Sequence, residues 1–216
     1  MSNQIFMLST ALPWIVLTYL ICSISFAVIV SRAFGLPDPR TFGSKNPGAT
    51  NVMRTGKKVA ALLTLLGDTG KAILALWIVK LQLGTPPAIS NGFSPYEITY
   101  ALCAFAAILG HIYPIFFRFE GGKGVATGLG ILLMLSPWLG LAVLASWVLV
   151  FFMWRVSSLS AIMACLLAPL YASVFFGTLS SYTLTVVALS GLLLFRHQSN
   201  IRNLLTGQEK AFKNND

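Results

Sequence analysis

Charged side chains are scarce in this sequence. Only 10% of its 216 residues are Asp, Glu, Lys or Arg, and just six are acidic. A soluble domain carries about 25% charged residues, so this scarcity excludes an ordinary soluble protein. Instead, 56% of the residues are hydrophobic and occur in long blocks, with a mean hydropathy of +0.78. We therefore predict a multi-pass membrane protein whose single domain extends over residues 1–216.

Cysteine is also rare. Cys22, Cys103 and Cys165 lie far apart, each within an apolar run. This spacing excludes a disulfide framework and offers no metal-ligand cluster, so we predict neither a metal nor a cofactor. No Lys or Arg occurs in residues 1–4, and the first apolar block is longer than the core of a secretory leader, which has about 7–15 residues. We expect this block to be retained as a membrane span.

Seven apolar segments are candidates for transmembrane helices, because about 20 apolar residues cross a bilayer. They cover approximately residues 7–30, 59–80, 97–117, 125–136, 138–154, 159–177 and 180–195. Ser136-Pro137 interrupts the region that would otherwise form one long helix, and it makes the fourth and fifth spans short. The expected fold class is an all-α integral membrane protein with seven transmembrane helices.

The distribution of basic residues favours two spans rather than one between residues 125 and 154. With seven spans, Lys80 is alone on one face. The other face receives Arg32, Arg40, Lys45, Arg54, Lys57, Lys58, Arg118, Lys123, Arg155, Arg196, Arg202, Lys210 and Lys213. The positive-inside rule then predicts an outside N-terminus and a cytoplasmic C-terminus. Such a face attracts anionic membrane lipid, and because the aromatic residues lie in the spans we expect no nucleic-acid partner.

Three glycines surround Lys123 in the glycine loop (residues 121–127), between two apolar segments. A nucleotide-binding Walker loop needs Ser or Thr after the lysine, whereas Gly124 follows here, so that function is excluded. Backbone N–H groups freed by glycine, a helix N-terminus and a lysine all favour an anion. Thr127 could add a hydroxyl. We interpret the loop as a phosphate site for a membrane-associated substrate; the alternative is a flexible turn.

Two further polar segments lie on the same face. The first polar loop (residues 41–54) contains Ser44, Asn46 and Arg54, whose planar fork suits phosphate. Asn51 lies one helical turn before Arg54, so both could face one site. The alternative is an ordinary polar loop whose Asn and Gly residues form turns.

The tail (residues 196–210) follows the last span. If it is helical, His197 and Asn200 share one face, and Glu209 could pair with a loop cation. The alternative for the tail is a solvated amphipathic end on the membrane surface.

Three ionisable residues lie inside predicted spans. Asp68 and Lys71 are three residues apart in the second span, which favours an ion pair between them. His111 lies near the cytoplasmic end of the third span and should have a polar partner. We expect all three to support the site structurally rather than to take part in chemistry.

These segments together resemble the bacterial PlsY family of acyl-phosphate:glycerol-3-phosphate acyltransferases. The matching stretches are GSKNPGATNVMR (residues 43–54), GHIYP (110–114), GGKGVAT (121–127), HQSNI (197–201) and GQEK (207–210). Their order and spacing agree along nearly the whole chain, and the combination is specific although each motif alone is weak.

The resemblance implies transfer of a fatty acyl group from acyl phosphate to the 1-hydroxyl of glycerol 3-phosphate. The products are lysophosphatidic acid and phosphate, an early step of bacterial phospholipid synthesis. It also implies a location in the bacterial cytoplasmic (inner) membrane, with the active site facing the cytoplasm. Because an acyl phosphate is already activated, the protein would mainly position the two substrates and neutralise charge.

The resemblance also implies residue roles. The catalytic residues would be Ser44, Arg54, Lys123, His197 and Asn200. The same residues and Asn46 would bind glycerol 3-phosphate. Acyl phosphate would be bound by Gly121, Gly122, Lys123, Gly124, Val125, Ala126 and Thr127, so that Lys123 touches both substrates. Structural support would come from Asp68, Lys71, His111 and Glu209. The base is either His197 or the phosphate of the acyl donor, and the lack of an evident Asp–His pair favours the phosphate.

Two other functions fit a polar membrane protein. One is a membrane transporter of a phosphorylated metabolite, and the other is a non-catalytic lipid-binding scaffold. A transporter is disfavoured because the sequence has no evident repeat and its polar groups gather at one surface rather than near the midplane.

Overall fold

The structure is a computed structural model that describes residues 2–84 and 92–209, with side chains from residue 11 onward. Its elements are the helices α1 (Ser2–Cys22), α2 (Phe26–Ala33), α3 (Ala49–Met53), α4 (Lys58–Leu83), α5 (Pro95–Ile112), η1 (Ile115–Phe117), α6 (Val125–Leu135), α7 (Pro137–Trp154), α8 (Ser157–Phe176), α9 (Ser181–Arg196) and α10 (Gln198–Leu205). The prediction of an all-helical fold is confirmed for the described residues.

Five helical segments are long and apolar enough to cross a membrane. They are Ala11–Ala33, Lys58–Leu83, Pro95–Phe117, Pro137–Trp154 and Ser157–Phe176. The predicted fourth and seventh spans correspond to α6 and α9, which are apolar but have only 11 and 16 residues. The predicted fifth span, residues 138–154, agrees with α7 to within one residue. Pro137 begins α7, and Ser136 caps the helix through the N–H of Leu139.

The predicted first span, approximately residues 7–30, corresponds to the candidate span Ala11–Ala33, but it is not one unbroken helix. Helix α1 ends at Cys22 and α2 begins at Phe26. The break leaves the carbonyl of Ile24 outside any helix, and the ammonium of Lys71 donates to this oxygen at 2.6 Å. A side chain from α4 thus satisfies the backbone group that the break exposes, as an apolar environment requires.

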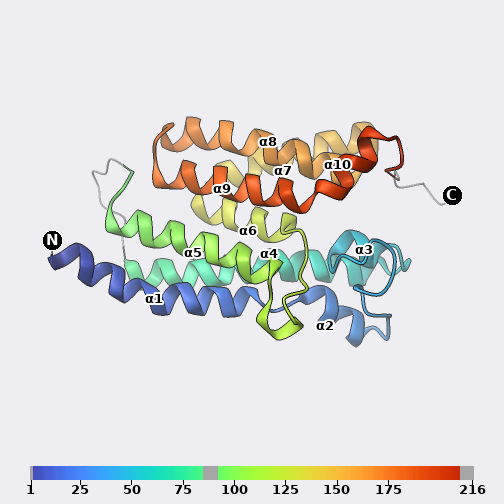
Figure 1. Cartoon of the computed structure of the whole chain (residues 1–216), viewed down its shortest axis with the longest axis horizontal. Coiled ribbons are helices and arrows are strands. Elements are labelled where there is room, and N and C mark those ends of the chain that lie inside the picture. Colours follow the sequence, from blue (N-terminus) through green and yellow to red (C-terminus); the bar gives the residue numbers. More distant parts are fainter. Residues whose placement is uncertain (1, 85–91, 210–216) are drawn as a thin grey trace.

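Successive long helices run in alternate directions along the bundle (Figure 1). Helices α1 and α4 lie on one side, α7 and α8 lie on the other, and α5, α6 and α9 lie between them. The closest pairs are α1 with α5, α4 with α6, and α7 with α8. The first polar loop, the glycine loop and the tail all lie toward the end that holds α2, α3 and α10. The fold therefore gathers the three polar segments.

Small residues allow the helices to approach closely. A Cβ on Gly110 of α5 would lie 2.4 Å from the carbonyl oxygen of Tyr19 in α1. A Cβ on Gly130 of α6 would lie 2.4 Å from the carbonyl oxygen of Thr69 in α4. Close backbone packing of this kind is the main source of helix association in a membrane, where burial of apolar side chains gives little gain.

A buried polar cluster joins these helices at the level where α1 breaks. Lys71 Nζ lies 2.8 Å from Asp68 Oδ1, which confirms the predicted pair. The same ammonium lies 3.1 Å from Nδ1 of His111 on α5, so this histidine has the partner that the sequence led us to expect. Thr127 at the start of α6 donates its hydroxyl to the Asp68 carbonyl at 3.0 Å. The cluster therefore fixes α4, α5 and α6 relative to one another.

Replacing Lys71 with methionine should lower the free energy of unfolding by about 3–5 kcal/mol, because Asp68 would keep a buried charge without its partner. Thermal unfolding of the detergent-solubilised protein measures the loss. The Asp68→Asn/Lys71→Met double variant removes both charges and should lose less than the single variant. A single variant as stable as the unaltered protein would contradict this role of the ion pair.

Candidate active site

A cavity of about 660 Å³ opens between the polar loops and extends down among α4, α6, α7, α8 and α9. Twelve predicted site or support residues line it: Ser44, Asn46, Arg54, Asp68, His111, Lys123, Gly124, Val125, Ala126, His197, Asn200 and Glu209. Segments separated by more than a hundred residues therefore meet around one space. The other predicted residues, Gly121, Gly122, Thr127 and Lys71, do not line it.

Asn51 organises the first polar loop. Its Nδ2 donates to the carbonyls of Pro39 at 2.8 Å and Phe42 at 3.1 Å, and its Oδ1 accepts the N–H of Ser44 at 3.1 Å. The amide is thus occupied by the backbone, although the residue also lines the cavity. Asn51 therefore holds Ser44 at the cavity, while Arg54 is presented at the end of α3.

The glycine loop is packed against the end of α5. Gly121 N–H donates to the Ile112 carbonyl at 3.2 Å, and Gly122 N–H donates to the His111 carbonyl at 3.3 Å. A Cβ on Gly121 would lie 2.0 Å from the His111 carbonyl oxygen. These glycines are needed for close approach, and their N–H groups already have acceptors. This arrangement differs from the open phosphate nest that the sequence led us to expect.

The start of α6 offers the donors that remain. The hydroxyl of Thr127 is fully buried and bonded to Asp68, so it points away from the cavity. The N–H groups in the first turn of a helix have no partner within that helix. Val125 and Ala126 of this turn line the cavity beside Lys123. A phosphate there would meet a helix N-terminus as well as an ammonium.

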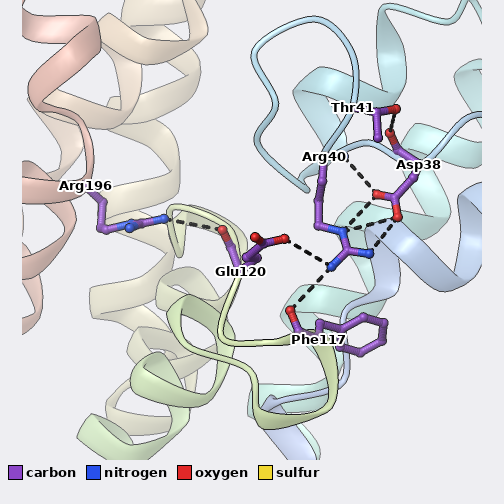
Figure 2. Close-up of polar contacts among 7 residues, drawn as sticks. Asp38, Arg40, Thr41, Phe117, Glu120 and Arg196 are labelled. Atoms are coloured by element: carbon purple, nitrogen blue, oxygen red, sulfur yellow. Dashed lines mark hydrogen bonds and ion pairs between the residues drawn. The ribbon is translucent and has the colours of Figure 1, made fainter.

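Two arginines hold the chain around the glycine loop (Figure 2). Arg40 lies 3.5 Å from the Glu120 carboxylate and donates to the Phe117 carbonyl at 3.4 Å, and a 2.7 Å ion pair with Asp38 orients it. The hydrogen bonds from Arg40 lower the pKa of Asp38. Arg196 donates to the carbonyls of Gly121 and Gly122, each at 3.4 Å.

From the sequence alone, both arginines are expected only to add positive charge to one face of the membrane. Their positions next to the quoted motifs, Arg40 before the first polar loop and Arg196 before His197, are the signal that could have identified them.

Lys123 is linked to the tail. Its ammonium donates to Oδ1 of Asn200, and Nδ2 of Asn200 donates to Glu209 at 2.7 Å. Glu209 also accepts a hydrogen bond from Ser158 of α8. The expected pairing of Glu209 with a loop cation is therefore corrected, because its direct partners are an amide and a hydroxyl.

Burial lowers the pKa of Lys123, and the charge of Glu209 opposes this effect. The positive charges of Arg196 and Arg54 lower the pKa of Lys123 further. Three cations near one space make it favourable for an anion.

His197 is held in one orientation at the end of α9. Its Nδ1 lies 2.7 Å from the Leu193 carbonyl, which only accepts, so Nδ1 carries the proton and Nε2 has a free lone pair. The side chain is buried, and burial lowers its pKa to about 4, with the Lys123 charge adding to the shift. His197 is therefore neutral at pH 7.

Comparisons with known proteins match the chain over nearly its whole length. The family profile described as Glycerol-3-phosphate acyltransferase matches residues 12–207. This chain belongs to the glycerol-3-phosphate acyltransferase family. A relative of that name from Thiobacillus denitrificans is 53% identical over 90% of this chain and 94% of its own. Another from Chromobacterium violaceum is 50% identical over 96% of this chain and 98% of its own.

Solved structures give the same result. The crystal structure of PlsY, an integral membrane glycerol 3-phosphate acyltransferase, in its glycerol 3-phosphate form has a TM-score of 0.83 and 33% identity. It matches 94% of this chain, and 96% of the PlsY chain is covered. The lysophosphatidic acid form has a TM-score of 0.82 and 32% identity. The predicted resemblance to PlsY, the acyltransferase class and the integral membrane character are confirmed.

The state of His197 makes a prediction about stability. The folded protein has a His197 pKa of about 4, whereas the unfolded chain has the ordinary value of 6.5, so the unfolded state binds more protons between these values. Lowering the pH through this window should cost the unaltered protein about 3 kcal/mol more than His197→Gln. Thermal unfolding of both proteins across this pH range measures the difference. Parallel pH profiles would show that burial does not disfavour protonation of His197.

Proposed function

We propose that this protein transfers a fatty acyl group from acyl phosphate to the 1-hydroxyl of glycerol 3-phosphate. One observation carries the proposal: a single cavity has cationic, hydrogen-bonding side chains at its loop end and apolar side chains between the helices. This shape fits two phosphorylated substrates of which one carries a hydrocarbon chain. The products are lysophosphatidic acid and inorganic phosphate.

Glycerol 3-phosphate fits the polar end. Arg54 and Lys123 supply positive charge, and Ser44, Asn46 and Asn200 supply hydrogen bonds around it. The crystal structures of PlsY in glycerol 3-phosphate and lysophosphatidic acid forms support this assignment, because their fold matches this chain over 94% of its length.

Acyl phosphate fits the boundary between the polar and apolar parts. Its phosphate would lie at the start of α6, next to Lys123, and its chain would extend into the groove. Lys123 then touches both phosphates and brings the two substrates together. Such positioning, together with the neutralisation of charge on the departing phosphate, accounts for most of the catalysis expected here.

The reaction needs a proton acceptor. The hydroxyl oxygen bonds to the acyl carbon as the bond from that carbon to the phosphate oxygen breaks, and the hydroxyl proton must leave. His197 presents an unprotonated Nε2, but its pKa of about 4 makes it a weak base. We assign the proton of the reacting hydroxyl to the departing phosphate, and we assign to Nε2 of His197 a hydrogen bond accepted from the other hydroxyl of glycerol 3-phosphate.

The proposed enzyme crosses the membrane seven times, with α6 and α9 as short passes. The alternating helix directions support this count (Figure 1). The basic loops around the cavity face the cytoplasm by the positive-inside rule, so the N-terminus lies outside and the C-terminus inside. The site then faces the cytoplasmic side of the bacterial inner membrane, where it meets a soluble substrate and a lipid-like one.

Purified protein supplied with acyl phosphate and glycerol 3-phosphate should release lysophosphatidic acid and phosphate in equal amounts. Mass spectrometry and a phosphate assay measure the two products. Folded protein that makes neither product would contradict the proposal. Flux of glycerol 3-phosphate across liposomes without acylation would instead support a transporter.

Arg54→Ala should raise the KM for glycerol 3-phosphate about 30-fold or more, because removing one partner of a desolvated charge pair costs about 2–5 kcal/mol. Steady-state kinetics at saturating acyl phosphate measure this change. Arg202→Ala is the matched control, since Arg202 is exposed on α10 and does not line the cavity. Identical KM values for glycerol 3-phosphate in both variants would show that Arg54 does not bind this substrate.

A further inference from the structure

The apolar part of the cavity has a smooth wall formed by α8. Ala161, Ala164, Cys165 and Ala168 all line the cavity, and their spacing of three and four residues places them on one face of the helix. Bulkier residues of α7, among them Trp147, line the cavity with them. The groove beside these small side chains is open space within the cavity, continuous with the phosphate-binding end.

The groove has a floor where four helices converge. Leu132 of α6, Val143 of α7, Ala168 of α8 and Val186 of α9 line the cavity and also belong to one packed cluster. Beneath them the same cluster continues with Leu139 and Ala172, both fully buried.

A hydrogen bond from Thr183 Oγ1 to the Ala172 carbonyl, at 3.2 Å, ties α9 to α8 below that level. The groove therefore ends at tightly packed side chains rather than passing through the bundle.

The distance from the polar end to the floor is set by helix geometry. Along α8 the lining extends from Ser157 to Ala168, and along α9 it extends from His197 to Val186. Each interval corresponds to about 16 Å of helix axis. A hydrocarbon chain that starts at the phosphate site thus has a finite path before it reaches Ala168 and Val186.

We propose that Ala168 and Val186 determine the longest acyl chain that this enzyme accepts. The inference rests on the proposed acyl-phosphate reaction and deepens it. The small methyl of Ala168 keeps the floor low, and a larger side chain there would raise the floor into the groove. The side chain of Val186 opposes it from α9, so a smaller residue at that position would extend the groove. The length of the acyl chain is then limited by steric exclusion at the level of Ala168 and Val186.

The open side of the groove is an alternative path for the hydrocarbon chain, which could leave there instead of reaching the floor. Leu62 and Leu65 of α4 line the cavity and are also 53% and 42% exposed, so the groove opens toward lipid near its polar end. The acyl donor enters from the membrane through this side. If the end of the chain also left the groove through it, side-chain size at the floor would have no effect on chain length.

The test compares kcat/KM for lauroyl, myristoyl, palmitoyl and stearoyl phosphate in matched variants. Ala168→Leu should reduce the ratio of palmitoyl to lauroyl phosphate utilisation about tenfold or more, as expected for extra bulk in a hydrophobic pocket. Val186→Ala should shift preference toward stearoyl phosphate. The KM for glycerol 3-phosphate should be unchanged in both. Ala145→Leu makes the same substitution at an exposed position of α7 outside the cavity, and it should match the unaltered protein.

The outcomes separate this inference from the reaction on which it rests. Unaltered protein that uses none of the acyl phosphates would overturn the proposed function itself. Active protein whose chain-length profile is the same in Ala168→Leu, Val186→Ala and Ala145→Leu would overturn the floor alone. If Ala168→Leu fails to fold, Val186→Ala decides the matter, because it removes bulk and predicts a shift of opposite sign.

Discussion

The candidate site depends on the contacts that the Lys71 ammonium makes. It binds the Asp68 carboxylate, the carbonyl that the break after α1 exposes, and the ring of His111. No water is available in the bilayer interior, so each of these groups must find its partner within the protein. The backbone of Asp68 also receives the hydroxyl of Thr127. Through these bonds a few buried polar groups set the positions of α4, α5 and the start of α6, and with them the position of the glycine loop.

The charged groups at the polar end of the cavity lie next to this support. Arg54 and Lys123 line the cavity, and burial disfavours the charge of Lys123. The carboxylates of Asp68 and Glu209 also line it, and Asp68 is paired with Lys71. A phosphate would stabilise the charges of Arg54 and Lys123 and would accept hydrogen bonds from the α6 N-terminus. The neutral state of His197 has the same origin, because a second buried cation next to Lys123 would be costly. The electrostatics of the candidate site thus favour anionic substrates.

The apolar groove gives the site its second property. Short α6 and the small side chains of α8 leave room between helices, whereas the cluster of Leu139, Ala172 and Val186 closes that room below. A substrate with a charged head and a hydrocarbon tail matches both ends of the cavity at once. With the proposed acyl-phosphate donor, positioning would be the main contribution of the protein, because that donor carries its own leaving group.

Composition and charge placement along the sequence were sufficient to predict the membrane class, the helical fold and the three polar segments that meet around the cavity. These features are local, since apolar length and loop charge can be counted residue by residue. The Asp68–Lys71 pair was predictable for the same reason, because its partners lie one helical turn apart. The break after Cys22, the role of Asn51 in the loop and the contacts of Arg40 and Arg196 depended on neighbours that are distant in sequence. The glycine loop is the clearest case: its glycines indicated an anion nest, but only the packed end of α5 decided that Gly121 and Gly122 are needed for close approach. Tertiary packing made that decision because a backbone N–H bonds to whichever acceptor the fold brings within reach.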